Sequence, residues 1–258
     1  MIPKVFHYCW FGHNPLPDSA IACINSWKLY CPDFEIVRWD ENSFDVNLYE
    51  YTSKAYAAKK WAFVSDVARL WIILNHGGVY MDTDVEVIRP LDDVLLSDMM
   101  YLGFESKEFV QTGLGFGAVR DFYLVKKMLD IYNDLSFINP DGSFNITPCS
   151  VYNTEILRQE GFKINNTLQS SNGITLYPTE YFCPKDFWTG KRSLSEKTYT
   201  IHHFDASWQS EDERLRHLQR QRYTAVLGKS IGSRVFGAVR VLKSDGLKGL
   251  ALKLFRQN

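Results

Sequence analysis

Asn75-His76-Gly77-Gly78-Val79-Tyr80-Met81-Asp82-Thr83-Asp84-Val85-Glu86-Val87 is the segment that tells most about the fold of this chain of 258 residues. An apolar segment rich in helix formers precedes it, and the glycine pair predicts the end of that helix. The valines and the methionine that follow are typical of a strand. Side chains two positions apart in an extended chain point to the same side, so we expect the carboxylates of Asp82 and Asp84 to face one ligand. Hard divalent cations prefer such oxygen ligands, and the stretch therefore predicts a metal site.

The residues before the acidic pair extend the pattern. Ser65-Asp66 and Arg69 lie in the apolar helix, ahead of the glycines and Tyr80. Taken alone, Asp-Thr-Asp also fits a solvated strand end that leads to a turn at Pro90. With the longer constellation, the chain resembles glycosyltransferase family 32, the DXD-motif sugar transferases that include fungal mannosyltransferases and bacterial capsule or lipopolysaccharide enzymes. More distantly, it resembles the glucosyltransferase domains of large bacterial toxins.

The resemblance implies a role for residues around the motif. Trp10 follows the first expected strand and would pack against the donor base, although its spacing fits a core tryptophan equally well. Asp66 and Arg69 share one side of their helix and could form a surface ion pair. The resemblance implies instead that both side chains face the donor sugar and phosphates. It implies a donor site of Trp10, Asp66, Arg69, Tyr80, Asp82, Ser207 and Trp208, with Asp66, Arg69, Asp82 and Asp84 at the catalytic centre.

A second polar segment, Thr200-Ile201-His202-His203-Phe204-Asp205-Ala206-Ser207-Trp208, lies at the end of a strand that begins near Tyr199. Adjacent histidines are usually structural. The resemblance implies instead that one of them is a further metal ligand and that the Trp208 ring N–H binds the diphosphate. Strand alternation aims only one of His202 and His203 inward, and the pattern leaves open which one joins the aspartates. Imidazole suits Mn²⁺ better than Mg²⁺, so we expect Mn²⁺, with Mg²⁺ as the other choice.

The composition bounds the class of protein. A formal net charge of -1 argues against a nucleic-acid partner, because proteins that bind the phosphate backbone usually carry a basic excess. The five cysteines form no Cys-x-x-Cys pair, which predicts reduced thiols in a cytosolic protein and neither a disulfide framework nor a zinc site. No secretion signal and no run of about 20 apolar residues stands in the sequence, so we expect neither export nor a membrane span.

The order of expected elements places the chain in the α/β class. A helix from Pro17 to about Tyr30 lies between strands at Ile2–Tyr8 and Phe34–Trp39, and this order implies a right-handed crossover with parallel pairing. The resemblance implies a GT-A type, single Rossmann-like nucleotide-sugar-binding domain with a mostly parallel central sheet over residues 1–209, followed by a helical appendage over 210–258. Other expected elements are a helix at Tyr56–Asn75 and strands at Met100–Phe104, Leu114–Val119, Gly173–Tyr177 and Tyr181–Cys183.

The last segment of the sequence is more basic than the rest of the chain. From Gly228 to Asn258, seven lysines and arginines stand against Asp245 alone, interleaved with apolar residues. This pattern predicts a basic amphipathic tail that lies on an anionic membrane surface, or a helical appendage packed on the domain or on a dimer partner. We therefore expect a cytoplasmic protein that is peripheral on the inner face of the cell membrane.

The expected function is that of a metal-dependent retaining glycosyltransferase. It would move a hexose from a nucleotide diphosphate sugar, with a UDP-sugar favoured, to a hydroxyl of a glycan or lipid-linked saccharide in surface polysaccharide biosynthesis. Where many relatives have asparagines, this chain has Gln111-Thr112-Gly113, which leaves the donor sugar open. The alternatives are a metal-dependent phosphohydrolase, which leaves Trp10 and Trp208 unexplained, and a noncatalytic glycan-binding module, against which the acidic constellation counts.

Overall fold

The computed structural model describes residues 1–205 and 211–255, with side chains at all of these except 93, 94, 211 and 245–255. The chain forms two compact units, each described here by itself. The first consists of Met1–Pro184 and Ser193–His203, and the second of Lys185–Arg192 and Phe204–Asn258. The expected division after residue 209 stays a prediction.

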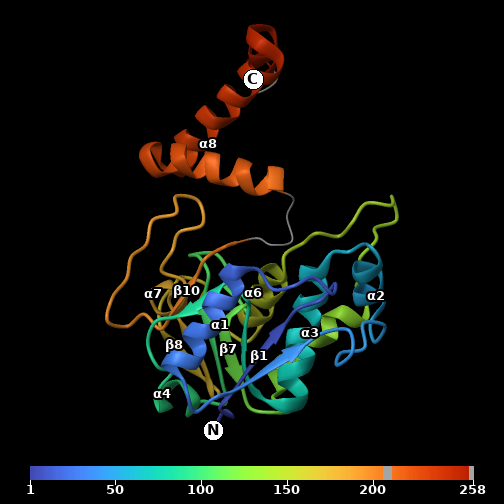
Figure 1. Ribbon diagram of the computed structural model, residues 1–258, viewed down its shortest axis with the longest axis vertical. Helices are drawn as coiled ribbons and strands as arrows, with labels where there is room; N and C mark the ends of the chain where they lie inside the picture. The colour runs from blue at the N-terminus through green and yellow to red at the C-terminus, as the bar shows by residue number, and fades with distance from the viewer. Residues whose placement is uncertain (206–210, 256–258) are drawn as a thin grey trace. The chain divides into compact units, whose positions relative to one another are not determined.

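An eight-stranded sheet is the centre of the first unit (Figure 1). Its order is β2-β1-β3-β7-β5-β9-β8, with β6 beside β5. The pairs β1/β2, β1/β3 and β5/β9 are parallel, so five strands run in one direction and β6, β7 and β8 run in the other. The α/β class and the mainly parallel sheet are confirmed. The strands are β1 Val5–Cys9, β2 Glu35–Trp39, β3 Gly78–Met81, β5 Met100–Phe104, β6 Val110–Gln111, β7 Leu114–Ala118, β8 Gln169–Ser171 and β9 Ile174–Tyr177. A separate two-stranded sheet pairs β4 (Val85–Val87) with β10 (Thr200–His202).

Most expected helices are present, and two expectations are wrong. The helix expected at Tyr56–Asn75 is two helices, because the chain turns at Lys59 with φ +57°. The strand expected at Tyr181–Cys183 is helical, since burial of Phe182 against the Tyr101 ring, centroids 5.6 Å apart, overrides the β propensity of its aromatic residues. The helices are α1 Asp18–Tyr30, α2 Glu50–Ala57, α3 Trp61–His76, α4 Asp93–Leu96, α5 Tyr123–Asp130, α6 Cys149–Gln159, α7 Thr179–Phe182 and α8 Glu211–Phe255, with a short 3-10 turn at Ile131–Asn133.

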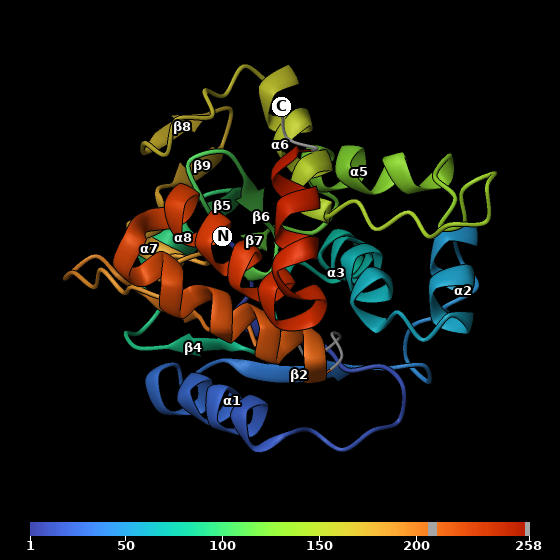
Figure 2. The ribbon, with the colours of Figure 1, turned by 90° about the horizontal axis from the view of Figure 1, so that it is seen from above.

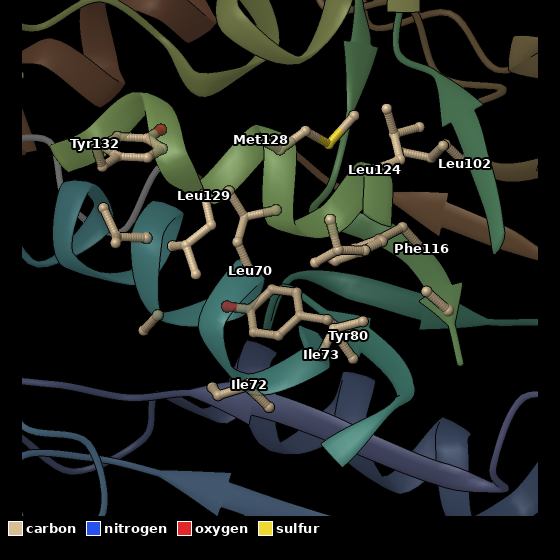
Figure 3. Packing of buried hydrophobic residues seen from close by; sticks show 14 of the residues in the cluster. Leu70, Ile72, Ile73, Tyr80, Leu102, Phe116, Leu124, Met128, Leu129 and Tyr132 are labelled. Atoms are coloured by element: carbon tan, nitrogen blue, oxygen red, sulfur yellow. The ribbon is translucent and has the colours of Figure 1, made fainter. Parts of the chain in front are cut away.

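Helix α3 is buried between the sheet and α5. Figure 3 shows Leu70 of α3 beside Leu129 of α5, Ile73 of α3 next to Tyr80 of β3, and Phe116 of β7 on the sheet side. These side chains are almost fully buried, and each buried aliphatic or aromatic side chain contributes about 1.5–3 kcal/mol. The packing fixes the rotation of α3, and with it the direction in which its polar residues point.

The glycine pair ends α3 as predicted. Gly77 and Gly78 have φ values of +69° and +99°, a left-handed region that favours glycine. A Cβ at Gly78 would lie 2.8 Å from the backbone oxygen of Val5 on β1. The pair therefore lets the chain reverse from α3 into β3 directly beside β1.

Two predictions drawn from composition can be compared with the structure. All five cysteines are buried and free in the structure. Among the described residues, every helix is too short or too polar to span a bilayer.

Candidate metal and donor site

The two aspartates follow β3 at its carboxyl end. The chain does not stay extended there, as the sequence had led us to expect, but turns, with the Val85 N–H donating to the Asp82 carbonyl at 3.1 Å. The Asp82 N–H in turn donates to the Gly113 carbonyl at 2.9 Å, which ties the turn to the start of β7. The turn, and not strand alternation, therefore brings the Asp82 and Asp84 carboxylates together.

A histidine from the far end of the chain completes this group. In the antiparallel pair of β10 and β4, His202 stands opposite Val85, directly after Asp84. The His202 Nε2 atom lies 3.3 Å from the Asp84 Oδ1 atom, and one ligand atom from each of Asp82, Asp84 and His202 lies within 4.8 Å of the others. Two carboxylates and one imidazole fit Mn²⁺ or Mg²⁺, and the imidazole favours Mn²⁺.

His203 does not join the group. Its Nε2 atom lies 2.8 Å from the Glu86 Oε2 atom, and its backbone N–H donates to the Asp84 carbonyl at 2.9 Å. Successive side chains of a strand point to opposite faces, so His202 turns toward the aspartates and His203 turns away. The structure thus brings together only one of the two expected histidines.

Arg69 holds the acidic group from the side of α3. Its Nη2 atom lies 3.0 Å from Asp82 Oδ1 and 3.1 Å from Asp66 Oδ1, and its Nε atom donates to the Ser65 carbonyl at 3.1 Å. The Arg69 side chain is only 4% exposed. A buried guanidinium needs such partners, and these contacts connect α3 to the acidic turn.

Tyr80 and Gly113 set the position of the Asp82 carboxylate. The buried Tyr80 hydroxyl lies 3.3 Å from Asp82 Oδ1, and the Arg69 guanidinium lies 4.9 Å from the centre of the Tyr80 ring. A Cβ at Gly113 would lie 1.9 Å from Asp82 Oδ2, so only glycine leaves room for the carboxylate. Gly115, with φ +107°, marks a bulge where the β3–β7 register shifts.

The electrostatics of the site favour protonation of its ligands. Burial raises the pKa of Asp82 to about 6, although the neighbouring Arg69 opposes the shift. Burial lowers the pKa of His202, but the Asp84 carboxylate and the Cys183 thiol beside it together outweigh burial and hold that pKa well above the ordinary value. Metal ligands must be deprotonated to bind, so a cation at this site competes with protons.

The other residues that we expected to bind the donor are Trp10, Ser207 and Trp208. Trp10 is partly buried just after β1, and its Nε1–H donates to the Asn14 carbonyl at 2.7 Å within its own loop. Ser207 and Trp208 lie outside the described residues. The structure therefore groups Asp66, Arg69, Tyr80, Asp82, Asp84 and His202.

Glu105 and Cys149 belong to the site although the sequence interpretation did not single them out. Glu105 directly follows β5, and burial raises its pKa while the neighbouring His202 and Gln111 side chains oppose the shift. Cys149 is the first residue of α6, and its thiol donates to Gln111 Oε1 at 3.0 Å. Glu105 could have been found from its place after a predicted strand that ends at the same edge as β3.

Two solved structures match the chain at low sequence identity. One is the PaToxG glycosyltransferase, with 16% identity, a TM-score of 0.47, and coverage of 62% of this chain and 69% of that one. The other is a glycosyltransferase involved in the glycosylation of the major capsid of PBCV-1, with 13% identity and a TM-score of 0.43. It matches 84% of this chain and 100% of its own length.

Sequence comparison points to the same residues as the geometry. Residues 17–101 match a glycosyltransferase sugar-binding region containing a DXD motif. Inositol phosphoceramide mannosyltransferase 3 of Schizosaccharomyces pombe is 31% identical over 102 residues, which are 36% of this chain and 27% of that protein. An uncharacterized glycosyltransferase of Acanthamoeba polyphaga mimivirus is 25% identical over 226 residues, which are 81% of this chain and 84% of that one. The chain spans less than a third of the mannosyltransferase, but residues 17–101 include Asp66, Arg69 and both aspartates of the turn. Residues 17–101 are therefore similar to the sugar-binding region of glycosyltransferases that contain a DXD motif.

Proposed function

We propose that the protein is a metal-dependent retaining glycosyltransferase that moves a hexose from a nucleotide diphosphate sugar to a hydroxyl of a glycan or lipid-linked saccharide. A UDP-sugar is the favoured donor, and surface polysaccharide biosynthesis is the favoured setting. The observation that carries the proposal is the convergence of Asp82, Asp84 and His202 beside the buried Arg69. Both aspartates and the arginine lie in the segment that matches the sugar-binding region.

In this proposal Asp82, Asp84 and His202 would hold Mn²⁺ or Mg²⁺. The bound ion supplies positive charge against the diphosphate that leaves with the nucleotide. Arg69 acts mainly as a positioning residue, because its guanidinium is engaged by Asp66, Asp82 and the Ser65 carbonyl. Tyr80 and Gly113 hold the Asp82 carboxylate at a fixed place before the ion arrives.

In this proposal the donor also contacts residues outside the metal group. Trp10, Ser207 and Trp208 are assigned to the donor by resemblance, and Glu105 is a further carboxylate near His202 and Asp84. A retaining transferase of this type needs no separate base, since a departing phosphate oxygen can accept the proton of the acceptor hydroxyl. The place of action in the proposal is the inner face of the cell membrane, where a lipid-linked acceptor would be reached.

The proposal is tested by screening nucleotide sugars for thermal stabilisation with and without MnCl₂. A donor at 100 times its dissociation constant stabilises the folded state by about 2.7 kcal/mol, which gives a clear rise in melting temperature. Asp84→Ala should remove both the Mn²⁺-dependent shift and transfer to an acceptor. Asp130→Ala, at an exposed Lys126 ion pair, is the matched control and should change neither. Unchanged transfer by Asp84→Ala would remove the metal from the mechanism.

The two alternative functions predict different outcomes in the same assay. A phosphohydrolase would release phosphate from the nucleotide without any acceptor present. A noncatalytic glycan-binding module would bind sugars whether or not Mn²⁺ and nucleotide were present. Either result would overturn the proposed transfer reaction.

A further inference from the structure

Helix α8 of the second unit is a helical hairpin. Gly228 has φ +76°, and beyond it the chain turns back, as Figure 2 shows for α8. The Tyr223 and Phe236 rings, from the two sides of this turn, have centroids 5.9 Å apart. A Cβ at Gly232 would lie 2.5 Å from the Thr224 Cα, so the two arms touch closely at a glycine. We call residues 212–227 the first arm and residues 229–244 the second arm.

The hairpin also holds the loop Lys185–Arg192 of the same unit. The Gln221 side chain donates to the Phe187 carbonyl at 2.7 Å. Arg220 and Lys229, one from each arm, lie 4.6 Å from the centre of the Trp188 ring. Because both arms contact this one tryptophan, the loop fastens the hairpin in its folded form.

The hairpin carries a charge of one sign. Between Arg214 and Ser244 the sequence has eight lysines and arginines and no aspartate or glutamate. Two of these cations are occupied by Trp188, as above. Within the part of the chain that the structure describes, no carboxylate forms an ion pair with Arg222, Arg240 or Lys243. These three side chains are exposed and are thus available to an anion.

The same three cations meet at a pocket. Its volume is about 430 Å³, and its lining includes Arg222, Tyr223, Phe236, Val239, Arg240 and Lys243. The first two come from the first arm, and the other four follow a spacing of three and four residues along the second arm, so each arm contributes one face. The pocket therefore depends on the hairpin being closed.

Apolar side chains are exposed on the pocket side of the first arm. Leu215, Leu218 and Val226 are 48%, 54% and 81% exposed, and with Arg222 they follow the helical spacing of three and four residues. A soluble phosphate compound would gain nothing from them. A bilayer would bury them while its charged head groups met the cations, which is the pattern of helices that lie in a membrane interface.

We propose that the pocket of the α8 hairpin binds the phosphate of an anionic phospholipid head group and so docks the protein on a membrane surface. Arg222, Arg240 and Lys243 contact the phosphate, Tyr223 and Phe236 line the pocket at the level of the head groups, and Leu215, Leu218 and Val226 enter the acyl boundary. This site is separate from the residues of the metal group, and its test does not require glycosyl transfer.

The test is flotation of the full chain with vesicles of phosphatidylcholine alone or with one quarter phosphatidylglycerol, at about 0.1 M salt. The protein should float with the anionic vesicles and remain behind with the neutral ones. The double variant Arg222→Gln with Arg240→Gln removes one pocket arginine from each arm. It should weaken partitioning roughly 25-fold, since each cation near an anionic surface contributes about a fivefold factor.

The matched control is Arg214→Gln with Arg234→Gln. It also removes one arginine from each arm, and neither residue lines the pocket. It should weaken partitioning no more than about threefold, and circular dichroism should show equal helix content for both variants. Glutamine keeps a helix propensity close to that of arginine, so the comparison isolates the position of the charge.

Four outcomes would overturn the proposal. Equal losses in the two double variants would mean diffuse attraction without a pocket. Equal flotation with neutral vesicles would mean that head-group charge does not matter. Release of the protein from anionic vesicles by 10-fold excess inorganic phosphate over lipid, at constant ionic strength, would assign the pocket to soluble phosphate compounds. A concentration-dependent dimer in light scattering, lost in the pocket variant and with no flotation, would assign the face to a second copy of the chain.

Discussion

The His202 Nε2 atom lies 3.3 Å from the Asp84 Oδ1 atom, across the antiparallel pair of β10 and β4. This contact joins the end of the first unit to the acidic turn near its middle. It also separates His202 from its neighbour His203, which faces Glu86. Each of the following predictions depends on an arrangement of this kind, in which one side chain is placed by a distant part of the chain.

The two histidines should differ sharply in their effect on metal binding. His202→Ala should weaken Mn²⁺ binding by more than the roughly 10- to 100-fold that loss of an outer-shell partner costs, since it removes a ligand. His203→Ala is the control and should stay within about twofold. Isothermal titration with MnCl₂ measures both, and equal losses would contradict the assignment of His202.

A change at Gly113 should disturb the metal site without removing any ligand. In Gly113→Ala the new Cβ would lie 1.9 Å from Asp82 Oδ2, so the carboxylate must move. We expect Mn²⁺ affinity to fall at least about tenfold. Gly161→Ala is the control for general strain, because Gly161 has φ +87° and nothing within 4 Å of an added Cβ. The control should lose roughly 1 kcal/mol of stability and keep its metal affinity. Normal Mn²⁺ binding by Gly113→Ala would show that the Asp82 position is not critical.

Arg69 should matter for stability as well as for the site. Arg69→Met leaves the partly buried Asp66 and Asp82 without their cation, and the cost of about 3–5 kcal/mol for breaking a fully buried ion pair is the upper bound here. Urea unfolding at pH 7 without metal measures the loss. Arg158→Met, at an ion pair with Glu155 that is about half exposed, should change stability by less than about 1 kcal/mol. A similar small effect at Arg69 would mean that the acidic group is solvated.

His7 should make stability depend on pH between about 4 and 6.5. The Trp39 Nε1–H donates to His7 Nδ1 at 3.1 Å, so the His7 Nε2–H donates to the Gly77 carbonyl at 3.0 Å and the ring is neutral. Burial lowers the His7 pKa to about 4. A lowered folded-state pKa gives stability that is present above pH 6.5 and is lost as the pH falls toward 4, by about 3 kcal/mol.

The measurement for His7 is urea unfolding at pH 7.5 and pH 4.5, compared with His7→Gln. The difference in unfolding free energy between wild type and His7→Gln should shrink as the pH falls, because only the wild type loses this contribution. His13→Gln, at a residue whose side chain is 71% exposed, should follow the wild type at both pH values. A pH-independent difference for His7→Gln would show that the ring is not held neutral.

The local pattern of the sequence was enough for much of the fold. The Gly77-Gly78 pair predicts the end of α3 because both residues adopt positive φ values that other residues avoid. Strand-forming runs predict β1, β2, β5 and β7 to within about three residues, and their order with the helices predicts the α/β class. Local rules failed at Tyr181–Cys183, where packing of Phe182 against Tyr101 outweighed β propensity.

Reasoning from the local sequence pattern predicted only part of the candidate site. Asp82 and Asp84 are close in sequence, so their pairing could be predicted, although the turn that joins them could not. Glu105 was missed because nothing near it in sequence shows which residues its side chain faces; the tertiary structure brings it to Gln111 and His202.

Local sequence was sufficient to infer where α3 ends, that two carboxylates stand together after it, and that the segment from Gly228 onward is basic. Only the tertiary structure decided that His202 and not His203 turns to Asp84, that Arg69 is engaged by Asp66 and Asp82, and that Gly113 makes room for a carboxylate. The physical reason is that backbone preferences and periodicity act over a few residues. The pairing of β10 with β4 and the packing of α3 on the sheet depend instead on burial shared between segments that are remote in sequence.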